Sequence, residues 1–221
     1  MQQSFDNLAK QYDNWYDTRK GKQIFEAELK CLQKVCPDLQ GRWLEVGVGT
    51  GRFASRMGIE EGIDPSSVML ELAASRGIRT YLGSVEGLPF EANSFDGILM
   101  AFTLCFIDSP DKALTQCHRI LKENGQLLVG LIPAESPWGK SYQEKKKQGH
   151  PIYSHAQFLT IENTIAITNK SGFELHESAC TLFCNPDALP KIFPQIETGT
   201  DEQAGFAALL FFKKDDIFFS T

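Results

Sequence analysis

The sequence predicts an α/β fold in which a mostly parallel sheet is covered by helices on both faces. Segments with the pattern of strands alternate with segments with the pattern of helices from residue 42 onward, which is typical of parallel βαβ units. A glycine-rich turn at residues 47–51 joins the first strand directly to a helix. The last two predicted strands, 173–183 and 206–212, have no helix between them, so we expect an antiparallel hairpin at one edge of the sheet.

Apolar spacing and turn residues define the elements of the first half. Residues 23–35 predict a helix because Phe25, Leu29 and Leu32 fall on one of its faces, and Pro37 stops it. The elements that follow are predicted as a strand at 42–46, a helix at Arg52–Met57, a strand ending at 63–64, a helix at 66–76 and a strand at 78–82.

Capping residues delimit the second half. Ser109 and Pro110 suit the N-cap and the first turn of a helix, and Gly125 marks the expected end of that helix. The remaining predicted elements are strands at 95–102 and 126–132 and a helix at 160–170, which Thr160 would cap.

Length, charge and composition limit which classes of protein are possible. The chain has 221 residues with a net charge of −6, so we expect residues 1–221 to form a single domain without a broad nucleic-acid surface. No apolar run approaches the ~18 residues needed to span a bilayer, and the amino terminus lacks the pattern of a signal peptide. The six cysteines include no Cys-x-x-Cys pair, which favours reduced thiols in the cytoplasm and no metal site. Nucleic acid and membrane are not expected partners, and the oligomeric state stays open.

The glycine-rich turn has the features of a nucleotide site. Gly47, Gly49 and Gly51 let the backbone approach a ligand with no Cβ in the way. The helix that follows presents free N–H groups, which favour an anionic group. Asp64 ends the next strand, where a carboxylate can accept hydrogen bonds from ribose hydroxyls. A nucleoside ligand is therefore predicted.

The spacing of the glycines distinguishes between nucleosides. A dinucleotide site has the form Gly-x-Gly-x-x-Gly, whereas the third glycine here is Gly51, one position early, and Arg52 stands where that glycine would be. With Glu45 before the turn and Asp64 after it, the pattern resembles the site of class I S-adenosylmethionine-dependent methyltransferases. Other segments resemble the small-molecule branch that includes quinone-biosynthesis methyltransferases, namely residues 95–102, 108–110 and 119–126.

This resemblance implies a fold, a cofactor and a reaction. The fold is a Rossmann-like three-layer sandwich with a seven-stranded sheet whose last strand is inserted antiparallel. The cofactor is S-adenosylmethionine, which leaves as S-adenosylhomocysteine after methyl transfer. The residues that the resemblance assigns to cofactor binding are Glu45, Gly47, Val48, Gly49, Gly51, Asp64, Pro65, Ser84, Val85, Glu86, Ala101 and Phe102.

The expected roles of these residues differ. Glu45 would orient the glycine turn and the methionine amine, and Asp64 would hold the ribose. Residues 83–90 end in Leu-Pro-Phe and resemble the segment of the family that flanks adenine. The family aspartate that accepts from the adenine amino group is replaced by Ser84, so that hydroxyl or Glu86 substitutes for it, or the contact is lost.

Two segments are expected to enclose the acceptor. One is an N-terminal cap at residues 1–36, and the other is a lid at 133–157, which is longer than the two to six residues such a connection needs. The aromatic residues of both could line the pocket or simply pack, and no catalytic base is identified. The candidate acceptor-binding residues are Tyr12, Trp15, Tyr16, Cys105 and Tyr153.

A small molecule is the expected acceptor, because the chain has no basic appendage for RNA. Whether nitrogen, oxygen, carbon or sulfur is methylated stays open. Two other classes of protein also remain open at this point. One is a non-catalytic nucleotide-binding or sensing protein, and the other is a nicotinamide-dependent dehydrogenase, which the glycine spacing opposes.

Overall fold

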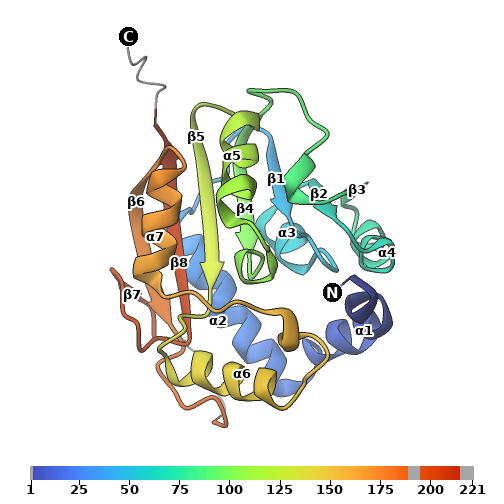
Figure 1. Cartoon of the computed structure of the whole chain (residues 1–221), viewed down its shortest axis with the longest axis vertical. Coiled ribbons are helices and arrows are strands. Elements are labelled where there is room, and N and C mark those ends of the chain that lie inside the picture. The colour runs from blue at the N-terminus through green and yellow to red at the C-terminus, as the bar shows by residue number, and fades with distance from the viewer. Residues whose placement is uncertain (1, 189–194, 215–221) are drawn as a thin grey trace.

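One eight-stranded sheet organises the protein (Figure 1). The computed structural model describes residues 2–188 and 195–214, with strand order β3-β2-β1-β4-β5-β8-β6-β7. The first five strands in this order are parallel, and β8 is inserted antiparallel between β5 and β6. The strands are β1 (Trp43–Val46), β2 (Glu61–Asp64), β3 (Arg79–Leu82), β4 (Phe95–Ala101), β5 (Leu121–Leu131), β6 (Phe173–Thr181), β7 (Glu197–Thr198) and β8 (Phe206–Lys213).

The predicted α/β class and the antiparallel pairing of the last two long strands are confirmed, while two details of the prediction are wrong. The sheet has eight strands instead of seven, because the two-residue strand β7 pairs with the edge of β6. The helix that was expected to end at Gly125 ends at Ile120, and β5 begins at once with Leu121. The first residues of β5 are irregular: the pairing with β4 shifts register between Leu121 and Gln126, and Asn124 has a left-handed backbone with φ of 57°.

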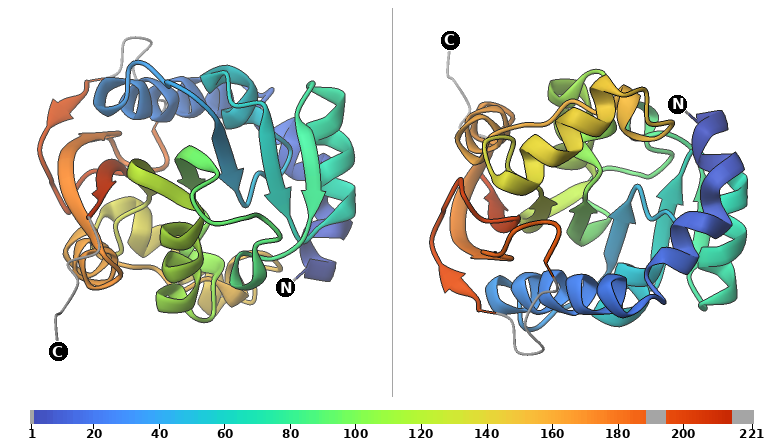
Figure 2. Two further views of the ribbon diagram at one scale, coloured as in Figure 1. Left: turned by 90° about the horizontal axis from the view of Figure 1, so that it is seen from above. Right: turned by 90° about the horizontal axis from the view of Figure 1, so that it is seen from below.

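Helices cover both faces of the sheet, which produces two apolar cores (Figure 2). One core joins the sheet to α2, α3 and α4 through residues such as Leu32, Phe53 and Leu70. The other joins it to α5 and α7 through Leu114 and Ile161. These helices are α2 (Arg19–Val35), α3 (Arg52–Met57), α4 (Ser67–Ser75), α5 (Pro110–Ile120) and α7 (Ile161–Lys170).

Side-chain caps fix where several of these helices start. Ser66 and Thr160 accept hydrogen bonds from backbone N–H groups three residues on, as their sequence positions predicted. Ser109 occupies the N-cap position of α5, but its side chain makes no capping bond. Helix α2 begins at Arg19 instead of residue 23, because Thr18 caps it through the N–H of Gly21 at 3.0 Å.

Two further helices lie beyond the carboxyl ends of the parallel strands (Figure 1). They are α1 (Gln2–Trp15) and α6 (Pro137–Lys147). Helix α6 falls within residues 133–157, a segment for which the sequence predicted a lid but no helix. Seen from below in Figure 2, α2 and α6 stand on opposite sides of the strand ends, with α1 along a third side. No helix within the described residues is both long and apolar enough to cross a membrane.

Candidate functional site

The glycine turn between β1 and α3 is held in shape by backbone conformations that suit glycine. Gly47, Gly49 and Gly51 have φ of 72°, 51° and 77°, all in the left-handed region. A Cβ on Gly47 would lie 2.5 Å from the Thr103 hydroxyl, and one on Gly51 would lie 3.0 Å from Ala73. A Cβ on Gly49 would meet nothing within 4 Å. Gly49 is therefore the glycine of the turn that faces open space.

Asp64 at the end of β2 is tied directly to this turn. Its Oδ2 accepts a hydrogen bond from the Gly49 N–H at 2.9 Å, and its Oδ1 accepts one from the Ser66 N–H at 2.9 Å. Burial raises the pKa of the carboxyl against the effect of these two bonds. Two segments that are fifteen residues apart are thus locked together at the carboxyl ends of neighbouring strands.

Glu45 supports the turn from behind. The side chain is 2% exposed, and its Oε2 accepts a hydrogen bond from the Ala54 N–H in the first turn of α3 at 2.7 Å. Burial raises the pKa of this carboxyl well above its usual range. Its contact is with the helix, which agrees with the predicted orienting of the turn; a contact with the methionine amine stays a prediction.

A cavity of about 780 Å³ begins at the glycine turn and Asp64 and extends to α1, α2 and α6, within the usual range of small-molecule sites. The structure brings most predicted cofactor residues to its wall, but not Glu45, Val48 and Gly51. Those on the wall are Gly47, Gly49, Asp64, Pro65, Ser84, Val85, Glu86, Ala101 and Phe102. All five predicted acceptor residues also line it, namely Tyr12, Trp15, Tyr16, Cys105 and Tyr153.

Phe102 follows β4 in a strained conformation. Its φ is 59°, which is uncommon for a bulky residue. The backbone N–H of Phe102 donates to the Gly130 carbonyl at 2.8 Å, and the ring packs against Phe53 and Phe206. Strain of this kind persists where the surroundings enforce it, often at a binding site. Phe102 also lies on the cavity wall.

The end of the cavity farthest from the sheet is aromatic. The hydroxyls of Tyr12 and Tyr16 are 3.0 Å apart, and the ring centroids of Tyr142 and Tyr153 are 4.7 Å apart. Burial raises the pKa of all four phenols. Burial likewise raises the pKa of the Cys105 thiol to about 12, so this cysteine stays protonated at neutral pH.

The sequence analysis missed several polar residues on the wall, among them Glu28, Lys20 and Lys145. Glu28 left a signal in the sequence. It lies four residues after Ile24 and four before Leu32, so a carboxylate interrupts the apolar stripe of α2. A charged residue in such a stripe is a candidate functional residue when no partner is near.

An ion-pair cluster, which we call the clasp, joins α1 to α3, which follows the glycine turn, and to α4. Asp13 of α1 binds Arg52, which opens α3, at 2.7 Å, and Arg76 at the end of α4 at 2.7 Å. Burial alone would raise the pKa of Asp13, but the two arginines outweigh it and lower this pKa to about 2. Arg52 also binds the exposed carboxylate of Asp17. No sequence pattern indicated this cluster, because its members are far apart in the chain.

Asp13→Asn is expected to destabilise the protein at neutral pH. The lowered pKa means that Asp13 stabilises the fold above its unfolded pKa near 4, and that this contribution is lost as pH falls towards 2. A change of about 2 kcal/mol corresponds to a melting temperature lower by about 4–8 °C. Thermal unfolding should show this difference at pH 7 and a smaller one at pH 3. Asp17→Asn, on the same arginine but exposed, is the control and should change little; equal effects of the two variants would contradict the clasp.

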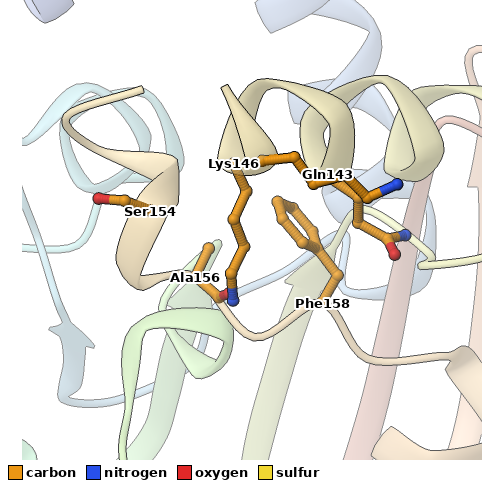
Figure 3. A pocket seen from close by; sticks show the side chains of 6 residues that line it. Gln143, Lys146, Ser154, Ala156 and Phe158 are labelled. Atoms are coloured by element: carbon orange, nitrogen blue, oxygen red, sulfur yellow. The ribbon is translucent and has the colours of Figure 1, made fainter. Parts of the chain in front are cut away.

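A second, shallower hollow lies between α6 and residues 154–158 (Figure 3). It has a volume of about 420 Å³ and contains Lys146, whose Nζ donates to the Ala156 carbonyl at 2.6 Å. None of the predicted site residues lines it. The larger cavity is therefore the candidate site.

Comparison with known proteins agrees with this geometry. A crystal structure from Thermotoga maritima, described as that of a SAM-dependent methyltransferase and possible histamine N-methyltransferase, covers 97% of this chain and 100% of its own with 34% identity and a TM-score of 0.89. The chain belongs to the S-adenosylmethionine-dependent methyltransferases. Residues 44–129 of this methyltransferase match the model of a family described as a methyltransferase domain.

Two further relatives of the methyltransferase are similar over most of their length. An uncharacterized protein of Methanocaldococcus jannaschii is 35% identical over 93% of this chain and 96% of its own length. The demethylmenaquinone methyltransferase of Thermotoga maritima is 29% identical over 77% of this chain and 86% of its own. The predicted family, its small-molecule branch and S-adenosylmethionine as cofactor are confirmed. The dehydrogenase and sensing alternatives receive no support from these similarities.

Proposed function

We propose that the cavity binds S-adenosylmethionine at its glycine-turn end and a small methyl acceptor at its aromatic end. The pairing of the Gly49 N–H with the Asp64 carboxylate at 2.9 Å carries this proposal. It joins a turn without side chains to a carboxylate suited to ribose hydroxyls, at the edge of the sheet where ligands of open α/β folds bind. Open space at Gly49, where no atom lies within 4 Å of the Cβ position, leaves room for the ribose and its neighbours.

In this proposal the other wall residues complete the cofactor site. Gly47 and Pro65 flank the ribose, and Ser84, Val85 and Glu86 border the adenine. Ala101 and Phe102 border the methionine part. Glu45, Val48 and Gly51 act indirectly, because they hold the turn and its helix in place from behind the wall.

The bound cofactor would supply a methyl group on a positively charged sulfur that is already a good leaving group. The chain's own residues then have to align the acceptor and exclude water from it, and correct orientation alone can account for a large rate enhancement. We assign these tasks to the cap within residues 1–36 and the lid at 133–157. Tyr12, Trp15, Tyr16, Cys105 and Tyr153 would form the wall of the acceptor end.

The acceptor proposed is a small molecule. A cavity of about 780 Å³ has to hold cofactor and acceptor together, and Tyr12 and Tyr16 line its aromatic end. The relative described as a demethylmenaquinone methyltransferase and the one described as a possible histamine N-methyltransferase both bear names of small acceptors. We further propose that the protein works in the cytoplasm, where free thiols such as its six cysteines stay reduced.

S-Adenosylhomocysteine is expected to raise the melting temperature of the protein. A ligand that binds only the folded state at a hundredfold excess over Kd stabilises it by about 2.7 kcal/mol, or about 5–11 °C for a chain of this size. Differential scanning fluorimetry with S-adenosylhomocysteine measures this shift, and NADH serves as the control ligand. A shift with NADH and none with S-adenosylhomocysteine would overturn the proposed cofactor site.

A further inference from the structure

Glu28 of α2 is a buried carboxyl group without its full set of partners. Its residue is 4% exposed, and its Oε2 has no hydrogen-bond partner. Burial raises its pKa well above the usual range, with no opposing contribution from a nearby cation. An unpaired carboxyl in an apolar interior destabilises a fold. Folding therefore does not explain Glu28, and a role in ligand binding can.

The same residue lies on the wall of the acceptor end of the cavity. Three phenols share this wall with it, those of Tyr12, Tyr16 and Tyr142. Burial is the main cause of their raised pKa values, and the charge of the Glu28 carboxylate adds to it. A carboxylate beside several aromatic rings is the chemistry that recognises an organic cation, since the carboxylate pairs with the charge and the ring faces attract it.

The lysines on this wall contact groups other than Glu28. Lys20 Nζ donates to the Pro186 carbonyl at 2.5 Å. Lys145 Nζ lies over the rings of Tyr142 and Tyr153, at 4.6 and 5.9 Å from their centroids. Within residues 2–188 and 195–214, no ion pair to Glu28 occurs. The position of Lys145 also shows that these rings accept an ammonium group.

We propose that Glu28 binds the positively charged amino group of the methyl acceptor, so that the acceptor is a small amine. This inference rests on the proposed function, since it assigns the far end of the cavity to the acceptor. Glu28 is here an anchoring residue that pairs with the ammonium group, while the phenols of Tyr12, Tyr16 and Tyr142 enclose the organic part. An acceptor that lacks a positive charge would leave the carboxyl unpaired and would bind more weakly.

Matched ligand pairs test the charge preference. Calorimetry on protein saturated with S-adenosylhomocysteine would compare 2-phenylethylamine with 2-phenylethanol, and tryptamine with tryptophol, which differ only in the amino or hydroxyl group. One charge-assisted contact predicts about 10- to 100-fold tighter binding of the amine. Equal affinities within both pairs, or binding by none of the four compounds, would overturn the proposal without any variant being needed.

Variants of the same helix then assign the preference to one residue. Glu28→Gln keeps the shape of the side chain but removes its charge, and it should abolish the difference between amine and alcohol. Glu26→Gln is the matched control: Glu26 is exposed on α2, where it pairs with Arg56 at 2.8 Å, and the variant should keep the preference. An amine preference that survives in Glu28→Gln would assign it to another group and overturn the proposal.

Two additional readouts separate binding from folding. The melting temperature of Glu28→Gln should equal or exceed that of the wild type, because the change removes an unpaired ionisable group. If Glu28 stabilised the fold, the melting temperature of Glu28→Gln would instead be lower than that of the wild type. S-Adenosylhomocysteine should bind Glu28→Gln and the wild type equally well. Failure of the wild type to bind it would refute the cofactor site, whereas intact cofactor binding without an amine preference would refute only the role of Glu28.

Discussion

Gly49→Val is expected to abolish S-adenosylhomocysteine binding while the protein stays folded. A Cβ at this position meets nothing within 4 Å, and Gly49 lines the cavity, so a side chain here projects into the space proposed for the cofactor. The left-handed backbone of Gly49, with φ of 51°, makes any side chain costly by about 1–2 kcal/mol, and more for a branched one. Isothermal calorimetry should therefore detect no binding, and circular dichroism should show a folded protein with a lowered melting temperature.

Gly58→Val is the matched control for this effect. Gly58 ends α3 with φ of 77°, and a Cβ there also meets nothing within 4 Å. The two variants therefore share the backbone strain and the absence of clashes, but only Gly49 lines the cavity. Gly58→Val should lose stability and keep its cofactor affinity. Normal cofactor binding by Gly49→Val would mean that the cofactor does not lie against the turn.

Asp64→Ala is expected to weaken cofactor binding by about 10- to 100-fold for each ribose bond lost, since a hydrogen bond to a charged group contributes roughly 1.5–3 kcal/mol. The variant also frees the Gly49 and Ser66 amides, which loosens the turn and adds to the loss. Calorimetric titration with S-adenosylhomocysteine measures the affinity.

Asp96→Ala is the matched control, because it also removes a carboxylate that accepts a hydrogen bond from a backbone N–H group. Asp96 stands near the start of β4, and its Oδ2 accepts from the Arg42 N–H at 2.7 Å, but the residue does not line the cavity. Its variant should bind the cofactor normally. If both variants lose affinity to the same degree, the effect of Asp64 comes from general loosening and not from ribose contacts.

The part of the site that depends on neighbouring residues in the chain could be predicted from the sequence. The glycine turn is specified by local backbone requirements, and Asp64 follows after one short helix. Nine of the twelve predicted cofactor residues lie on one cavity wall for this reason. Val48 and Gly51 are off the wall because Val48 is packed in the core and a Cβ on Gly51 would point at Ala73 of α4.

Features that arise from distant contacts could not be predicted in this way. Strand β7 has two residues and exists only because β6 offers an open edge. Helix α6 has a polar sequence, and its Ser136 cap is the signal that was overlooked. The role proposed for Glu28 depends on residues of other segments, because Tyr12 and Tyr142 come from α1 and α6. In the sequence alone, a single glutamate in a helix does not reveal that it is buried.

The clasp around Asp13 has a consequence for the affinities of the cofactor and the acceptor when both are bound. Arg52 comes directly after the last glycine of the turn, and it holds the helix that carries Tyr12. Any ligand that fixes the turn therefore also restricts the wall of the far half of the cavity, and the reverse holds as well. We therefore expect cofactor and acceptor to raise each other's affinity, and thermodynamic reciprocity requires the two factors to be equal. Asp13→Asn, which cuts the link, should bring that factor towards one.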